Sequence, residues 1–214
     1  MKIRSIDELE DLVSSEYAWR RKELTNLRGI ALSAKKSTSN NLLRSLIPIL
    51  YAHWEGFVKQ VSIAKLTYLV SKGIKYKDLN ESFLAYAAFE AFAGQIPAKR
   101  FEAISKIAKG DIGLDAPMKL NPEKYIDTKS NLNSEVLKEI SLKVGIDYAI
   151  FELKENMIDE RFLGLRNKIC HGEIVIVTKI EFDNLYAEVI CLIDLFKNLI
   201  LNSVHTKSYL KEAA

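Results

Sequence analysis

Apolar residues recur every three to four positions along most of the chain, which is the spacing of helices that bury one face. Two of these stripes begin with a capping box, in which Ser or Thr is followed three residues later by Glu. The pairs are Ser5 with Glu8 and Thr178 with Glu181. A further stripe extends from residue 43 to about Val70 and stops before Gly73. The pattern predicts three long helices, the first of which begins near Ile6.

Shorter helices are predicted between the second and the last long helix. Two fall within residues 80–109, where Gly94–Pro97 separates them, and one occupies residues 134–145. A further helix is expected from about residue 154 to His171, followed by Gly172 as a stop signal.

The segment between these helices, residues 110–133, has no helical period, and Gly and Pro residues interrupt it. We therefore expect an irregular insertion loop at the centre of an all-α fold, a bundle of long antiparallel helices. The chain has 214 residues, with neither an internal repeat nor a linker-like stretch. Residues 1–214 are accordingly predicted to form a single helical domain.

Composition and motifs exclude several classes of protein. No apolar stretch approaches the roughly 18 residues of a membrane span, and the N-terminus lacks the pattern of a signal peptide. We expect a cytoplasmic protein that does not enter membranes. The motifs of dinucleotide, P-loop, zinc-protease and serine-hydrolase sites are missing. Cys170 and Cys191 lack CxxC spacing, so we expect reduced, buried thiols, no metal site and no cofactor.

Charge is spread unevenly along the chain. The net charge is +3, but residues 1–110 hold 18 basic and 11 acidic residues, whereas residues 111–214 hold 13 and 17. The excess of basic residues in the first half is compatible with a surface that binds a polyanion. It is equally compatible with a solvated helix face that has no partner.

The segment Arg166–Gly172 combines side chains that suit phosphodiester chemistry. Arg166 offers a planar fork of donors for phosphate oxygens, and His171 can exchange protons near neutral pH. On a helix Asn167 and His171 share a face, while Arg166 lies about 140° from His171. The long arginine stem and the position of His171 at the helix end would let both groups reach one ligand. A helix-end histidine beside a solvated arginine is the alternative interpretation.

This segment resembles the R-x-x-x-x-H motif of the HEPN superfamily, including the Asn after Arg and the Gly after His. Other positions resemble a prokaryotic HEPN branch that is associated with toxin–antitoxin and defence loci. They are Trp19–Arg21, Tyr51–Gly56 and Asn131–Asn133.

The resemblance implies a helical bundle that forms a homodimer and a metal-independent endoribonuclease that cuts RNA by attack of its own 2′-hydroxyl. His171 would then assist proton transfer, and Arg166 would stabilise charge on the phosphate. Asn167 would orient His171 or bind a phosphate oxygen. An antitoxin or regulatory protein encoded beside it is the implied partner. Other HEPN members are non-catalytic modules that bind nucleotides or partner proteins, which is the alternative function.

Further candidates lie outside the motif. The resemblance makes Glu55, and less so His53, an accessory group near the motif that would hold His171 or Arg166 in place. Both are predicted to flank the apolar stripe of their helix, where local hydrogen bonding is the alternative. Contacts to the RNA backbone are assigned to exposed cations, with a solvated helix face as the alternative. These cations are Arg20, Arg21 and Lys168.

Overall fold

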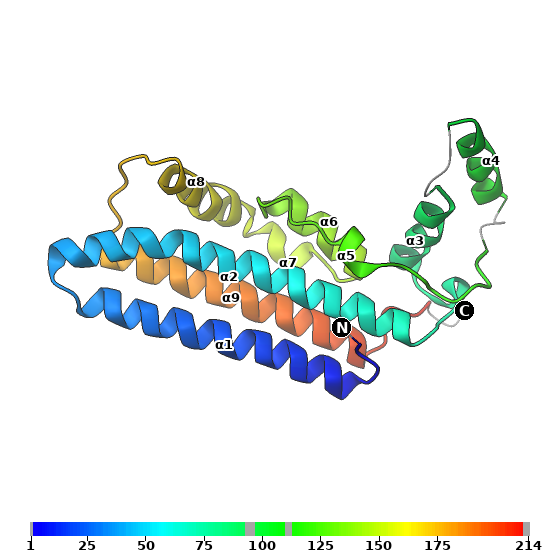
Figure 1. Ribbon diagram of the computed structural model, residues 1–214, viewed down its shortest axis with the longest axis horizontal. Helices are drawn as coiled ribbons and strands as arrows, with labels where there is room; N and C mark the ends of the chain where they lie inside the picture. Colours follow the sequence, from blue (N-terminus) through cyan, green and yellow to red (C-terminus); the bar gives the residue numbers. More distant parts are fainter. Residues whose placement is uncertain (1, 93–96, 110–112, 212–214) are drawn as a thin grey trace.

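Three long helices form the body of the protein, a computed structural model that describes residues 2–92, 97–109 and 113–211 (Figure 1). They are α1 (Ile6–Ser33), α2 (Lys36–Ser71) and α9 (Lys179–His205). Both predicted capping boxes are present at the starts of α1 and α9. The prediction of an all-α bundle of long helices is confirmed, and the described residues contain no β-strand.

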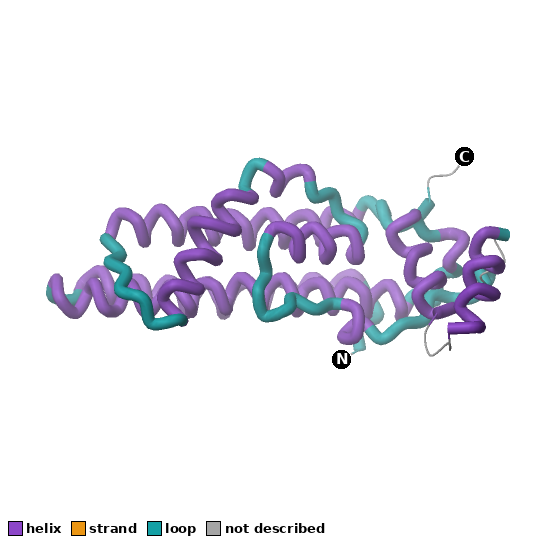
Figure 2. Tube along the Cα trace, turned by 90° about the horizontal axis from the view of Figure 1, so that it is seen from above, coloured by secondary structure: helices purple, strands orange, loops and turns teal. Residues whose placement is uncertain are grey.

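Contacts between the ends of the helices fix their directions. At the end of α9, His205 contacts Glu10 of α1, whereas Lys179 at its start donates to the carbonyl of Leu32. Helix α1 is therefore antiparallel to α9, and the tight turn at residues 34–35 makes it antiparallel to α2 as well. Helices α2 and α9 run in the same direction, because α8 and the segment after it return the chain to the same end of the bundle (Figures 1 and 2). The antiparallel arrangement predicted for the long helices therefore holds for α1 with each of the other two, but not for α2 with α9.

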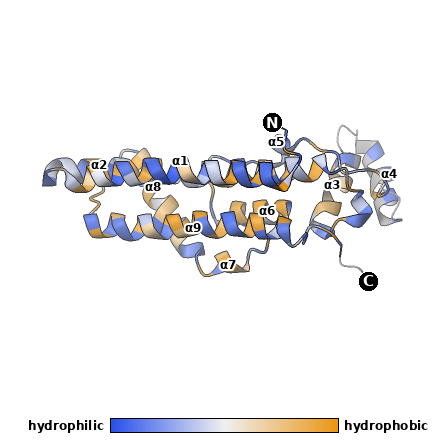
Figure 3. Ribbon diagram, turned by 90° about the horizontal axis from the view of Figure 1, so that it is seen from below, coloured by the Kyte–Doolittle hydropathy of each residue, from blue (hydrophilic) through white to orange (hydrophobic). Residues whose placement is uncertain are grey.

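Aromatic and aliphatic side chains fill the space between the long helices. Trp54 of α2 is fully buried, and its ring lies edge-on to Phe196 of α9 with 6.3 Å between the centroids. Bands of hydrophilic and hydrophobic residues alternate along α1 and α9, as expected of helices with one buried face (Figure 3). None of the helices in the described part of the chain is long and apolar enough to cross a membrane.

Shorter elements lie along one side of α2 (Figure 1). They are α6 (Ser134–Val144), α7 (Ala149–Glu152), the π-helical segment η2 (Met157–Gly164) and α8 (Leu165–Cys170). The sequence predicted one helix from residue 154 to 171, but residues 157–164 of this range form a π-helical segment. Such a segment admits an extra residue per turn, so it changes which side chains of α8 face α2.

Helices α3 (Glu81–Phe92) and α4 (Pro97–Ala108) confirm the two helices predicted within residues 80–109. Of the predicted break between them, residues 94–96 lie outside the described residues. The 3-10 turn η1 (Tyr76–Asp78) and α6 pack against α3, while α4 contacts α3 at the end of the molecule away from α8 (Figure 1).

The predicted insertion loop belongs to the core. Of residues 110–133, the described part is irregular except for the short helix α5 (Pro122–Tyr125). Met118, Ile126 and Leu132 from this segment are almost completely buried. The segment therefore covers part of α2 and completes the hydrophobic core.

Candidate functional site

The end of α8 is set by a local backbone motif. Gly172 has a φ of +82°, and its N–H donates to the carbonyl of Ile169 at 3.1 Å, while the Glu173 N–H donates to Lys168 at 3.0 Å. These two bonds form a Schellman cap, which requires the left-handed conformation that Gly adopts without strain. His171 is the last residue before this turn, and its side chain is exposed at the surface.

The segment after the cap is attached to α2. The Arg44 guanidinium donates to the carbonyl oxygen of Glu173 at 2.9 Å. This contact, together with packing of α8 on α2, fixes the end of the motif helix against the bundle.

Arg166 lies in the first turn of α8, and three groups hold its partly buried side chain. Its Cζ lies 4.5 Å from the ring centroid of Tyr51 on α2. Nη1 donates to Oδ1 of Asn167 at 2.7 Å, and Nη2 reaches the carbonyl oxygen of Ser130 at 3.4 Å. The guanidinium is thus oriented before any ligand arrives, with donors left over for a phosphate.

The Asn167 side chain binds Arg166. Its carbonyl oxygen accepts the Arg166 hydrogen bond, while its backbone carbonyl accepts the N–H of His171 at 2.9 Å. Among the described contacts, the Asn167 side chain has none with the His171 ring. The roles predicted for Asn167, orienting His171 or binding a phosphate oxygen, remain predictions.

Tyr51 connects α2 both to Arg166 and to the segment before α6. It is 2% exposed, and its hydroxyl accepts a hydrogen bond from the backbone N–H of Leu132. Burial raises the pKa of Tyr51 well above its usual value, and the nearby Glu55 carboxylate raises it further. The phenol therefore stays neutral and cannot serve as a general base near neutral pH.

Glu55 lies one helical turn after Tyr51 and binds the same segment. Its carboxylate accepts a hydrogen bond from Oγ1 of the buried Thr128 at 2.5 Å. The described contacts include none between Glu55 and either Arg166 or His171. Any accessory role of Glu55 would therefore pass through the segment that carries Thr128 and Ser130.

The backbone of this segment is unusual. Lys129 and Ser130 both have left-handed φ values, +55° and +51°. Two consecutive left-handed residues other than Gly are sterically disfavoured and persist only where their surroundings hold them. Asp127 accepts the Lys129 N–H at 2.8 Å, and Thr128 accepts the Asn131 N–H at 3.0 Å.

Comparison with known protein families identifies the family of the chain. The RiboL-PSP-HEPN family matches residues 15–202. This range includes Tyr51, the strained segment 127–132 with its two left-handed residues, and the whole of Arg166–Gly172. The chain belongs to the RiboL-PSP-HEPN family. No curated protein and no solved structure matches it significantly.

His53 lies on a different side of α2 from Tyr51, the residue that contacts Arg166 of the HEPN motif. It is buried against α1, where Nε2 contacts Glu23 at 3.1 Å and the ring lies 5.1 Å from that of Trp19. Burial lowers the pKa of His53, and the Glu23 carboxylate opposes this shift. The sequence predicted a boundary position near the motif, but α1 covers that flank of α2.

The three cations predicted to contact RNA have different environments in the HEPN bundle. Arg20 is buried beside Gly56, where it pairs with Glu16 at 2.8 Å, so its predicted contact with an RNA backbone requires correction: the guanidinium is not at the surface. Arg21 is half exposed and lies 3.5 Å from Asp194. Lys168 is exposed within the motif, so among these three cations it alone combines exposure with proximity to His171.

The thiols also differ from expectation. Cys170 and Cys191 are exposed, whereas the sequence predicted buried side chains. Within the described ranges, no group of three or more His, Cys, Asp or Glu residues could hold a metal ion.

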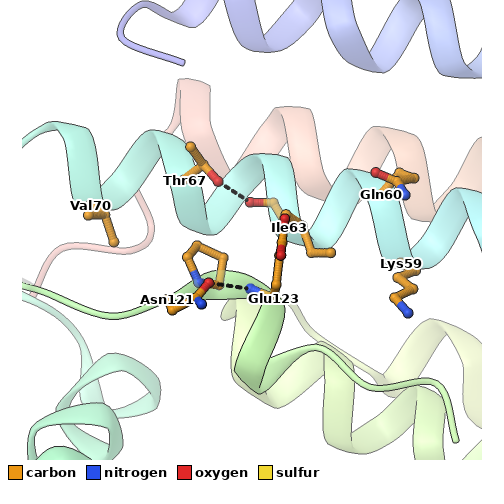
Figure 4. Close-up of a pocket in the computed structure, with 8 residues that line it drawn as sticks. Lys59, Gln60, Ile63, Thr67, Val70, Asn121 and Glu123 are labelled. Atoms are coloured by element: carbon orange, nitrogen blue, oxygen red, sulfur yellow. Dashed lines mark hydrogen bonds between the residues drawn. The ribbon is translucent and has the colours of Figure 1, made fainter. Parts of the chain in front are cut away.

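Two surface hollows lie near the site. One, of about 390 Å³, separates α8 from the start of α9, and Lys168, Val175 and Leu185 are among its lining residues. The other, of about 610 Å³, follows α2 beyond Glu55 and lies between Lys59 and Glu123 (Figure 4). Its polar side chains come from α2 and from the start of α5, so it continues the face of α2 that carries Tyr51 and Glu55.

Proposed function

We propose that this HEPN protein is a metal-independent endoribonuclease in which Arg166 and His171 carry the chemistry. The observation that carries the proposal is the unequal support of the two side chains on one short helix. Arg166 is held in place by Tyr51, Asn167 and Ser130, whereas His171 is exposed at the helix end. A fixed cation and an accessible proton carrier on one short helical segment suit the stabilisation of a phosphorane-like transition state.

The reaction uses a nucleophile from the substrate itself. The ribose 2′-hydroxyl attacks the adjacent phosphorus, the bond to the 5′-oxygen breaks, and the products are a 2′,3′-cyclic phosphate and a 5′-hydroxyl. His171 assists the transfer of the proton that leaves the 2′-oxygen or reaches the 5′-oxygen, and Arg166 stabilises the charge on the non-bridging oxygens. Because the nucleophile is already positioned within the RNA, no metal-bound hydroxide is needed.

A homodimer would complete the site. Three isoleucines that follow the motif are largely exposed, with Ile174 at 98%, Ile176 at 77% and Ile180 at 74%. Exposed apolar side chains this close together in the sequence favour an interface. A two-fold axis there would bring two copies of the Arg166–His171 pair to one cleft for the RNA backbone.

The biological setting that we propose is a toxin–antitoxin or antiphage system in the cytoplasm. It rests on the resemblance of the sequence to the defence-associated HEPN branch. A protein encoded beside this one would restrain the nuclease, since an unregulated ribonuclease would harm its own cell.

The decisive experiment incubates purified protein with total RNA in EDTA. His171→Ala and Arg166→Ala should each reduce cleavage by about 100-fold or more. His171→Ala should leave the melting temperature unchanged, whereas Arg166→Ala should lower it by a few degrees at most, because it also removes the contacts with Tyr51, Asn167 and Ser130. His205→Ala is the matched control, because this exposed histidine lies at the far end of α9 and contacts Glu10.

Each outcome separates the candidate functions. Cyclic phosphate ends that disappear with His171→Ala support the proposal. Cleavage that needs magnesium or leaves 5′-phosphate ends contradicts the mechanism. Tight binding of a nucleotide or protein partner without cleavage, unchanged by His171→Ala, would favour the non-catalytic alternative.

A further inference from the structure

We propose that Tyr51 is a positioning residue for Arg166, and that it acts through its ring and through the strained segment 127–132 at the same time. The inference rests on the proposed ribonuclease function. It assigns to α2 the task of presenting the guanidinium to the scissile phosphate.

The ring of Tyr51 provides one surface for Arg166. The guanidinium carbon lies 4.5 Å from the ring centroid, within the range of a cation–π contact. A guanidinium held over the ring still has N–H groups that point away from it, and these can bind phosphate oxygens.

The carbonyl of Ser130 provides a second contact, and its direction depends on the backbone. It accepts from Nη2 of Arg166 at 3.4 Å, and it belongs to the pair of left-handed residues Lys129 and Ser130. An extended or right-handed conformation at these residues would turn the carbonyl elsewhere, so the strained conformation and the contact to Arg166 are linked.

Helix α2 holds the strained segment at both of its ends. The Tyr51 hydroxyl accepts from the Leu132 N–H after the left-handed pair, and Glu55 accepts from Thr128 before it. Tyr51 and Glu55 are one turn apart on the same face of α2. One tyrosine therefore supports Arg166 directly with its ring and indirectly with its hydroxyl.

The first test removes the two hydrogen bonds that hold the segment but keeps the ring. In the double variant Tyr51→Phe with Thr128→Val, kcat for RNA cleavage should fall about 10- to 100-fold, since misplacement of a charged group by about 1 Å costs this much. Binding of RNA that is 2′-O-methylated at the cut site should stay within about twofold, because other contacts govern affinity.

Tyr86→Phe is the matched control. Tyr86 is also a buried tyrosine whose hydroxyl makes one hydrogen bond, donated to the carbonyl of Lys143, but it belongs to the contact between α3 and α6. It should leave kcat unchanged. If the double variant and the control cleave equally well, or if the double variant loses binding in proportion to kcat, the positioning role is overturned.

A second test reads the contact without relying on activity. The Arg166 Nε–H resonance, assigned by its disappearance in Arg166→Lys, should carry an upfield ring-current shift in the wild type that is retained in Tyr51→Phe and lost in Tyr51→Leu. An unchanged resonance in Tyr51→Leu would overturn the proposal. A wild type that shows this shift but cleaves no RNA would support the Tyr51 contact and refute the proposed ribonuclease function.

Discussion

Replacement of Lys65 by Met tests the energetics of the bundle most directly. Lys65 of α2 is completely buried, and its ammonium donates to the hydroxyl of Ser203 on α9 at 2.5 Å. That hydroxyl donates in turn to the carbonyl of Ile200. Burial lowers the pKa of Lys65 from 10.5 to about 7. The core thus contains an amine whose protonated form it disfavours.

The sign of the effect follows from proton binding. Between about pH 7 and pH 10.5 the unfolded chain holds the Lys65 proton while the folded protein releases it, so stability rises with pH in this window and is lost as pH falls to about 7. The lowered pKa of Lys65 reduces the free energy of unfolding by about 4 kcal/mol at pH 7. At pH 9 this reduction is smaller by about 2 kcal/mol.

Lys65→Met should therefore stabilise the protein by about 3–4 kcal/mol at pH 7. The lower value allows about 1 kcal/mol for the hydrogen bond that Ser203 loses. Urea denaturation at fixed pH values from 7 to 9 measures the difference between variant and wild type, in which the other titrating groups cancel. Lys59→Met is the matched control on the same helix, because its side chain is only partly buried, and it should change the free energy of unfolding by no more than about 0.5 kcal/mol. A difference between wild type and Lys65→Met that is constant from pH 7 to 9 would refute the reasoning.

Further predictions concern backbone strain and assembly. Gly145→Ala should lower stability by about 1–3 kcal/mol in thermal denaturation, because Gly145 has a φ of +64° and a Cβ there would lie 2.7 Å from the Phe83 ring; an unchanged melting temperature would contradict this. Ser130→Gly should raise stability by up to about 1 kcal/mol, since Gly adopts the left-handed conformation freely, and a lower melting temperature would count against strain at this position. Ile176→Asp should convert the proposed dimer to a monomer in sedimentation at micromolar concentration, whereas a dimer that persists would place the interface elsewhere.

Signals that are local in sequence predicted the fold well. The capping boxes at Ser5 and Thr178 and the Gly that ends α8 are read from residues a few positions apart, and all three mark helix ends in the structure. The long apolar stripes likewise predict α1, α2 and α9, because a stripe of this length fits no other element.

Features that depend on distant partners were not predictable in the same way. The helical wheel of α2 placed His53 at the edge of the apolar stripe, but only the position of α1 determines that this edge is buried. Arg20 of α1 is buried because it lies against Gly56 of α2, a contact that the sequence near Arg20 does not reveal. Met118 and Ile126 of the segment 110–133 are buried in the core. Their burial was not predictable, because isolated apolar residues in a segment without a helical period do not indicate which surface they will contact.

The candidate site combines both kinds of information. His171 lies at the helix end that the Schellman cap defines, and the bonds of this cap lie within the six residues Lys168–Glu173. Arg166 owes its orientation to Tyr51 and Ser130, which lie 115 and 36 positions earlier in the chain. The R-x-x-x-x-H spacing alone therefore specifies where the histidine sits but leaves the arginine free, and it is the bundle that supplies the remaining constraint. It follows that substitutions in α2 can displace Arg166 without moving His171, so loss of cleavage by such a variant would report the arginine's placement while the proton-transfer group remains intact.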